Sequence, residues 1–305
     1  MILTLIPTRI PAAPWLQRTV VALRDSLFPR GWAPLLRICS TFAPALRCYE
    51  AKLLDGDRLF LDLRESMCMG YFFHGELAHE RGTKEILGLV LSDGAAFVDV
   101  GANVGYYTRM AARIVGPNGK VLAFEPLPTA YQLLQRNSAD LVNVLALQSA
   151  LGDRSGTVPF YVHPSGDQSS TMNMGDAQEQ IRVEIKTLDS MTGQFDRVDF
   201  IKIDVEGSEL QVLQGGKETI ERFEPVIQFE FLPKYQDAYD LRFADFQDFF
   251  RTFSKAHYEV FRVSREIHGE LLAPVTAEGS DMLAVPRRRK SLLVGLRAAG
   301  GTHCQ

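Results

Sequence analysis

The sequence predicts an α/β protein built on a mostly parallel, doubly wound sheet, preceded by a helical and hairpin extension. Short apolar runs of strand length alternate with segments whose apolar residues recur at helical spacing, which indicates repeated βα units. Several of these runs lack polar alternation, as expected for strands buried on both faces. One of them ends in a glycine turn at residues 101–105, where nucleotide-binding α/β folds place their ligand.

Residues 1–50 are expected to form the helical extension. Its first helical stripe consists of Leu16, Val20, Leu23 and Leu27, and an apolar segment at 35–46 follows. Residues 50–73 are interpreted as strands with a hairpin turn at 55–57. The next polar residues match no strong metal-ligand spacing and are interpreted as a solvated loop, which contains His74, Glu76, His79 and Glu80.

The glycine turn connects a strand at 96–100 to a helix predicted over 104–115. It reads G-x-x-x-G and has Asn103 where a dinucleotide fingerprint requires its second glycine. The next strand ends at Glu125, which lies 20 residues after Gly105. A nucleotide-binding α/β unit places here the carboxylate that accepts hydrogen bonds from ribose hydroxyls.

The rest of the chain continues the βα rhythm as far as residue 285, so residues 51–285 are expected to form one domain. Further strands are predicted at 142–147, 158–162, 181–185, 198–204, 225–229, 259–263 and 281–285, and helices at 127–139, 209–223 and 243–253. Ser208-x-x-Gln211 has the form of a capping box for the helix at 209–223. A polar loop with Ser169 and Ser170 is placed over the ligand-binding edge, where it would contact a substrate.

Composition and cysteine usage indicate an ordinary globular protein. The chain of 305 residues is 46% hydrophobic and 23% charged, and no run reaches the length of a membrane span. The N-terminus lacks the basic start of a signal peptide, so a cytoplasmic location is expected. The four cysteines are scattered, which indicates neither a zinc site nor a disulfide framework.

Both ends of the chain are basic, although the net charge of the whole is −4. Residues 1–48 hold six arginines and one acidic residue, and the tail at 286–305, expected to be flexible, holds five basic residues and no acidic one. We interpret these ends as solvated or paired with the acidic body. The alternative is a weak contact of these ends with an anionic membrane surface or a nucleic acid. Nucleic acid is disfavoured, because the body of the sequence lacks a stripe of basic and aromatic residues.

Four residues at strand ends are expected to meet at the ligand-binding edge of the sheet: Gly101, Glu125, Asp204 and Glu230. Three carboxylates would make this pocket acidic, and the sequence contains no P-loop motif. These features favour a positively charged nucleoside without phosphates. S-adenosylmethionine has this chemistry.

The motifs DVGANVG, FEP at 124–126 and KIDVEGSE at 202–209, in this order, resemble the FkbM family of S-adenosylmethionine-dependent methyltransferases, and the resemblance covers roughly residues 55–230. It implies a Rossmann-like class I methyltransferase fold. It also implies roles in cofactor binding: the methionine moiety would be lined by Asp99, Gly101, Asn103 and Gly105, with Glu125 on the ribose, Ala150 beside the adenine and Glu80 as a further cofactor residue. Asp204 is also expected to contact the cofactor.

Methyl transfer to a hydroxyl needs alignment and a base. Asp204 and Glu206 are the first candidates for the base or for orienting the substrate, with Glu209 and Glu230 next as substrate residues. Their alternative role is structural, as helix caps and acceptors of backbone N–H groups. A divalent ion between Asp204, Glu206 and Glu230 is a further alternative, and we expect no metal.

The absence of two motifs narrows the possible classes of methyl acceptor. The chain has neither the N/D-P-P-[YF] turn typical of amino-group methylation nor a Pro-Cys pair typical of cytosine methylation. We therefore expect O-methylation of a small-molecule or glycan acceptor, on a sugar or natural product, as the resemblance also suggests. The alternatives are an RNA or protein methyltransferase, an NAD-linked oxidoreductase, and a non-catalytic nucleoside-binding protein.

Overall fold

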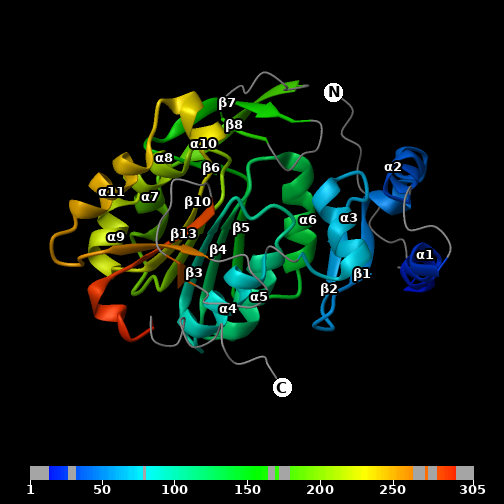
Figure 1. Cartoon of the computed structure of the whole chain (residues 1–305), viewed down its shortest axis with the longest axis horizontal. Helices are drawn as coiled ribbons and strands as arrows, with labels where there is room; N and C mark the ends of the chain where they lie inside the picture. The colour runs from blue at the N-terminus through cyan, green and yellow to red at the C-terminus, as the bar shows by residue number, and fades with distance from the viewer. Residues whose placement is uncertain are drawn as a thin grey trace.

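The computed structural model describes residues 14–26, 32–77, 80–163, 169–171, 179–263, 272–273 and 280–292. An eight-stranded sheet forms the centre of the molecule, in the order β12-β11-β13-β10-β9-β3-β4-β5 (Figure 1). In this order the strands are Leu272–Ala273, Glu259–Val263, Ser280–Val285, Val226–Phe231, Phe200–Ile203, Ala96–Val100, Lys120–Phe124 and Val144–Leu147.

The five strands from β10 to β5 are parallel, and β13, β11 and β12 extend the sheet in antiparallel pairs. The chain starts in the middle at β3, builds outward through β4 and β5, and then returns to the other side of β3 with β9 and β10. This reversal confirms the predicted Rossmann-like, doubly wound fold, and it creates a crevice at the carboxyl ends of β3 and its neighbours.

Both faces of the sheet are covered by helices because alternate residues of each strand point to opposite faces. Phe97 and Phe200 pack on the face that carries α4 and α5, whereas Val98 and Ile201 pack with α8, α9 and α11 on the other. The helices after β2 are α3 Ser66–His74, α4 Arg81–Val90, α5 Tyr106–Val115, α6 Pro128–Ser138, α7 Leu188–Thr192, α8 Glu209–Gln214, α9 Lys217–Phe223, α10 Pro233–Gln236 and α11 Phe243–Arg251.

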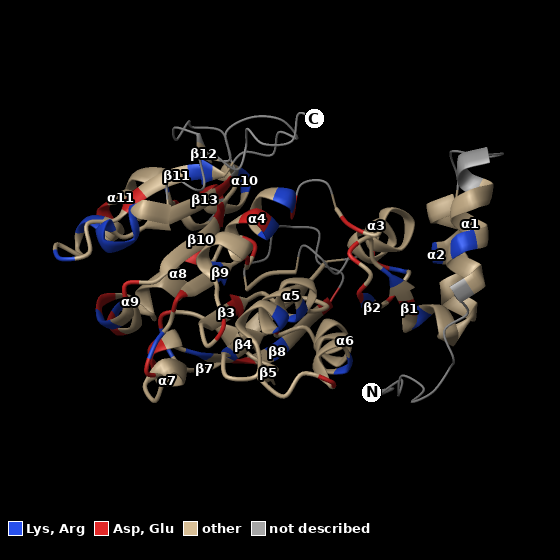
Figure 2. Cartoon of the chain, turned by 90° about the horizontal axis from the view of Figure 1, so that it is seen from below, with Lys and Arg blue, Asp and Glu red and all other residues tan. Residues whose placement is uncertain are grey.

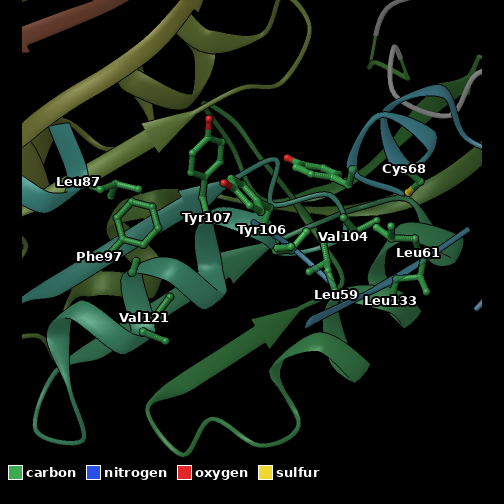
Figure 3. Packing of buried hydrophobic residues seen from close by; sticks show 14 of the residues in the cluster. Leu59, Leu61, Cys68, Leu87, Phe97, Val104, Tyr106, Tyr107, Val121 and Leu133 are labelled. Carbon is green, nitrogen blue, oxygen red and sulfur yellow. The ribbon is translucent and has the colours of Figure 1, made fainter. Parts of the chain in front are cut away.

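The N-terminal extension lies at one end of the molecule, with α1 and α2 farthest from the sheet (Figure 1). Its elements are α1 Pro14–Ser26, α2 Trp32–Phe42, the 3-10 helix η1 Pro44–Arg47 and the hairpin strands β1 Tyr49–Lys52 and β2 Arg58–Leu61. The Asn137 side chain holds the hairpin to the domain: its Oδ1 accepts the N–H of Phe60 at 2.7 Å, and its Nδ2 donates to the Phe60 carbonyl at 3.0 Å. Leu59 and Leu61 share one hydrophobic cluster with Val104 and Leu133 (Figure 3).

The prediction of strands throughout residues 50–73 is wrong after the hairpin, because residues 66–74 form α3. Most of this helix is buried, including Cys68, Met69, Tyr71, Phe72 and Phe73. A helix buried nearly all round has no polar face to give helical periodicity, and its aromatic residues are those that strands favour.

A second, three-stranded sheet of order β6-β8-β7 lies beside the main one. It consists of β6 Ala150–Leu151, β7 Gly156–Val162 and β8 Glu179–Lys186. Ser170 forms a bridge with Tyr161, which brings residues 169–171 to the end of this small sheet.

The predicted helix at 209–223 is two helices, α8 and α9, separated at Gly215 and Gly216. A side chain at Gly215 would place its Cβ 1.9 Å from the Gly152 carbonyl oxygen. Only glycine therefore fits at position 215, where the chain approaches the small sheet. The predicted capping box is absent as well. Ser208 makes no side-chain cap on α8 and instead bonds other hydroxyls.

The described start of the basic tail lies against the body of the protein. Residues 287–289 form the 3-10 helix η4, and three ion pairs join this segment to the domain: Arg288 with Glu224, Arg289 with Asp199 and Lys290 with Glu259. These pairs match the interpretation that basic ends pair with the acidic body. The predictions for Leu27, for His79 and for residues 293–305 concern residues outside those that the structure describes. Within the described chain, none of the helices has both the length and the apolar character needed to cross a membrane.

Candidate functional site

A cavity of about 550 Å³ opens at the carboxyl ends of β3, β4, β9 and β10. Its position at the point where the strand order reverses is the usual ligand site of such a sheet. Nine of the residues predicted for the site line it: Glu80, Gly101, Asn103, Glu125, Ala150, Ser169, Asp204, Glu206 and Glu230.

The glycine turn after β3 forms one wall of the cavity. Gly101 has φ +78°, and a Cβ there would lie 1.8 Å from the Asp204 carbonyl oxygen, so only glycine lets β3 and β9 approach this closely. Asn103 also has a positive φ, of 50°, which asparagine tolerates better than most residues. Its N–H donates to Glu125 Oε2 at 2.8 Å.

Glu125 ends β4 as predicted, and backbone N–H groups hold both of its carboxylate oxygens. Oε1 accepts the N–H of Leu127 at 2.8 Å, while Oε2 accepts that of Asn103. The side chain is buried against the cavity, and burial raises the pKa of Glu125 to about 7 although the two hydrogen bonds favour the charged form. Each oxygen keeps a second lone pair that can accept a hydroxyl of a ligand.

Glu80 is buried rather than solvated, so its interpretation as part of a polar loop is wrong. The Tyr71 hydroxyl donates to its Oε1 at 2.5 Å, whereas its Oε2 is buried without a hydrogen-bond partner among the described residues. Burial raises the pKa of Glu80 to about 7. Tyr71 comes from α3, the helix that the sequence did not reveal, so the environment of Glu80 was not predictable either.

Lys202 is a cavity residue to which the sequence assigned no role. Its ammonium is buried, lies 2.9 Å from Asp204 Oδ2 and sits over the Tyr107 ring, 5.0 Å from the centroid. Burial acts to lower the pKa of Lys202, but the negative charges of Asp204 and Asp99 outweigh it and raise the pKa. The lysine inside the apolar run F-I-K-I could have indicated this ion pair from the sequence, because a buried ammonium requires a carboxylate partner.

Asp204, Glu206 and Glu230 meet at the other end of the cavity, where one carboxylate oxygen of each lies within 4.8 Å of one oxygen of the other two. Glu206 adopts a left-handed conformation, with φ 56°, in the loop that follows β9. Burial, followed by the charge of Asp204, raises the pKa of both Glu206 and Glu230. This end of the cavity is therefore acidic, as the sequence predicted.

Glu209 and Ser170 do not line the cavity, and their predicted substrate contacts are not supported. The Glu209 carboxylate accepts the N–H groups of Val205 and Gly207 and the amide of Gln236 at 2.7 Å, so it shapes the loop after β9. The Ser170 hydroxyl donates to the Glu206 carbonyl at 2.9 Å. Both residues support Glu206 from behind the cavity wall.

Asp99 and Gly105 also lie behind the wall rather than on it. Asp99 is 1% exposed, accepts the Thr108 hydroxyl at 2.6 Å and acts on Lys202 through its charge. Gly105 has φ +87° at the start of α5, and a Cβ there would lie 2.7 Å from Leu134 Cδ1. Their positions indicate that they support the turn and the charge balance of the cavity.

Three hydroxyls from distant parts of the chain form a closed triangle beside the acidic end. The Thr171 Oγ1 lies 2.6 Å from Ser208 Oγ and 2.9 Å from the Tyr239 hydroxyl, and the last two are 2.8 Å apart. Thr171 and Ser208 line the cavity together with Ser169. The small sheet thus contributes to this wall through residues 169–171.

The fold and the cavity define a Rossmann-like α/β protein with its ligand site at the topological switch point. Comparison with family models is more specific. Residues 99–260 match the methyltransferase FkbM domain, and the chain belongs to this family.

Three curated relatives resemble the chain over part of its length. Methyltransferase sdnD of Sordaria araneosa is 33% identical over 40% of this chain and 60% of its own length. The 2-O-methyltransferase NoeI of Sinorhizobium fredii is 27% identical over 45% and 63%. The hexuronic acid methyltransferase AglP of Haloferax volcanii is 28% identical over 44% and 56%. The matched region thus spans little more than half the length of these relatives.

Proposed function

We propose that this chain is an S-adenosylmethionine-dependent methyltransferase that acts on a hydroxyl of a sugar or natural product. The observation that carries the proposal is the single cavity with two different ends. One end has the glycine turn and Glu125, which suit a nucleoside. The other has Asp204, Glu206 and Glu230, which suit a hydroxyl that must lose its proton.

The donors and acceptors of the first end fit S-adenosylmethionine. Glu125 would accept the ribose hydroxyls, and Ala150 would border the adenine. The unpartnered Oε2 of Glu80 would accept the ammonium of the methionine moiety, because a buried carboxylate oxygen needs a donor. A pyrophosphate fits poorly, since the Asn103 N–H already donates to the negative Glu125.

When bound, S-adenosylmethionine supplies a methyl group on a positively charged sulfur. The chain itself has to orient the acceptor and take up a proton. Asp204 faces the ammonium of Lys202, whereas Glu206 and Glu230 face other carboxylates. We assign Asp204 and Glu206 to the acceptor hydroxyl, as base and orienting group, with Glu230 beside them.

The acceptor class is supported by the wall and by the relatives. Hydroxyls and carboxylates line the acceptor end, among them Ser169, Thr171, Ser208 and Glu206, and such groups bond well to polyhydroxylated molecules. One relative is named a 2-O-methyltransferase and another a hexuronic acid methyltransferase. An RNA acceptor is disfavoured, because the acidic end would repel a phosphate backbone.

Titration calorimetry with three nucleosides tests the cofactor. We expect the full chain to bind S-adenosylhomocysteine and S-adenosylmethionine, and NAD far more weakly. Tight binding of NAD without either sulfur nucleoside would overturn the proposal in favour of an oxidoreductase.

The acceptor is then sought with S-adenosylmethionine labelled on the methyl group. Neutral glycans, uronic acid glycans, lipids, RNA and protein are offered in parallel, and transfer of the label to a glycan or natural-product hydroxyl is expected. Transfer only to RNA or protein would contradict the proposed acceptor class while leaving the cofactor assignment intact.

A further inference from the structure

Lys202 is a buried cation in the central sheet. The strands at the centre are mostly tan in Figure 2 because few of their residues are charged, and Lys202 of β9 is one of the charged residues. Its ammonium lies 2.9 Å from Asp204 Oδ2, whereas the described residues give Asp204 Oδ1 no hydrogen bond. A buried ammonium is unfavourable without a compensating carboxylate. The ion pair therefore explains how Lys202 is tolerated but not what holds its ammonium in place.

Three buried side chains from other elements contact the ammonium or one another. The ring of Tyr107, on α5, faces Nζ at 5.0 Å from the ring centroid. Burial raises the pKa of the Tyr107 hydroxyl, and a hydrogen bond from the Thr83 hydroxyl of α4 acts against this rise. Thr83 also accepts the amide of Gln228, on β10, at 2.6 Å. We call Gln228, Thr83 and Tyr107 the lysine support.

Gln228 is placed at a cost to stability. It lies between Ile227 and Phe229 in a strand that is almost fully buried, where apolar residues pack best. One atom of its amide bonds Thr83, while Oε1 is buried with no hydrogen-bond partner among the described residues. An unsatisfied buried amide oxygen opposes folding. The lysine support is therefore better explained by the orientation of the side chains that it connects than by stability.

We propose that Lys202 is a positioning residue for Asp204 and that the lysine support fixes its ammonium. The inference rests on the proposed function, in which Asp204 is the base for the acceptor hydroxyl. With the ammonium on Oδ2, Oδ1 is the oxygen that remains for this hydroxyl. The positive charge also favours the carboxylate form of Asp204, which a base requires.

Carboxylates from several elements surround the ion pair. Those that interact electrostatically with Lys202 or Asp204 are Asp99 on β3, Glu125 after β4, Asp281 on β13, Glu80 before α4, Glu206 after β9 and Glu230 on β10. Two further lysines, Lys84 and Lys234, act on Glu80 and Glu206 instead. Among the described residues, the cation paired with Asp204 is therefore Lys202.

The pH dependence of methyl transfer tests the role of Lys202. Lys202→Met keeps the length of the side chain without its charge. Activity on the identified acceptor should therefore be lost on acidification at a pH about one unit or more above that of the unchanged protein. Lys120→Met is the matched control and should leave the pH profile unchanged. The Lys120 ammonium also lies over an aromatic ring, that of Phe195 at 5.2 Å, but at the amino end of β4, away from the cavity.

Nitrogen-15 NMR tests the lysine support on the Lys202 ammonium and needs no acceptor. The unchanged protein should give a slowly exchanging ammonium signal that is absent in Lys202→Met. Hydrogen exchange of this signal should be about tenfold faster in Tyr107→Leu and about threefold faster in Thr83→Val. Tyr107→Leu should also move the acid limb of the pH profile upward, so the role of Lys202 is tested even if Lys202→Met does not fold.

Two results would overturn this inference alone: unchanged ammonium exchange in both support variants, or an unchanged acid limb in a folded Lys202→Met protein. Failure of the proposed function has a different signature. The unchanged protein would then bind no S-adenosylhomocysteine and transfer no label, and the function and this inference would fall together.

Discussion

The two ends of the cavity hold their carboxylates in different ways. At the proposed nucleoside end, backbone N–H groups of the turn and of the segment after β4 hold both oxygens of Glu125. At the proposed acceptor end, Asp204, Glu206 and Glu230 face one another, and of these three carboxylates Lys202 bonds Asp204. The first end therefore depends on backbone geometry, whereas the second depends on the balance of charge among its side chains. Substitutions at the two ends should have different effects on stability, binding and activity.

The largest effect is expected at Asp204. Asp204→Asn keeps the size of the side chain but removes its charge, so methyl transfer to the identified acceptor should fall by about 100-fold or more. Binding of S-adenosylhomocysteine should change little by comparison. Asp248→Asn, which removes an exposed carboxylate paired with Arg251, is the control and should keep full activity. Full activity in Asp204→Asn would remove Asp204 from the chemistry.

Gly101→Ala should damage the first end through the backbone. Alanine is strained at φ +78°, and its Cβ would collide with the Asp204 carbonyl, so the free energy of unfolding should drop by about 3 kcal/mol or more in urea titrations. Gly94→Ala separates the two causes, because Gly94 has φ +75° with open space around it. That variant should lose only about 1 kcal/mol. Equal losses would show that the close approach of β3 to β9 carries no energetic weight.

Glu125→Gln should weaken binding of S-adenosylhomocysteine by about tenfold in calorimetry, because one oxygen acceptor becomes a donor. Asp189→Asn is the matched control. The Asp189 carboxylate also accepts backbone N–H groups, from Glu218 and Thr219, but lies away from the cavity. Loss of affinity in both variants would mean that the effect comes from stability and not from contact with the nucleoside.

The smallest expected effect is a dependence of stability on pH, which tests the repulsion among the carboxylates of the cavity. Burial raises the pKa of Glu80, Glu125 and Glu209 to about 7, and that of Glu206 and Glu230 also rises. A raised pKa means that the folded state binds protons more tightly than the unfolded state. Stability should therefore decrease as pH rises from the ordinary glutamate range through neutral and alkaline values.

Glu230→Gln removes one of these groups. Its Tm should exceed that of the unchanged protein by about 3 °C at pH 9 and lie close to it at pH 5, which thermal unfolding at both values measures. Glu218→Gln, at an exposed position, should follow the unchanged protein at both values. A lower Tm for Glu230→Gln at pH 9 would contradict the inferred repulsion among the three carboxylates.

Local pattern was enough to predict the strands of the central sheet except β12, as well as the glycine turn and the position of Glu125, because an apolar run, a positive φ and a strand end are properties of neighbouring residues. The predictions that failed concern residues whose roles depend on partners distant in the sequence. Glu206 and Glu209 are three positions apart in the sequence but have different roles. Glu209 accepts the amide of Gln236 and is structural, whereas Glu206 lines the cavity. Glu80 was misread because Tyr71 and its helix were not foreseen.

The hydroxyl triangle of Thr171, Ser208 and Tyr239 has a consequence for how new substrate preferences arise. Its three members come from separate segments of the chain, Tyr239 from the 3-10 helix η3 Asp237–Tyr239, whereas the glycine turn and Glu125 belong to one continuous βαβ unit. These segments lie outside that unit and meet one another through side-chain hydrogen bonds, so their composition can change independently of it. Under the proposed function, recombining the segments around residues 169–171 and 235–239 between family members should therefore exchange the acceptor and leave the donor unaltered.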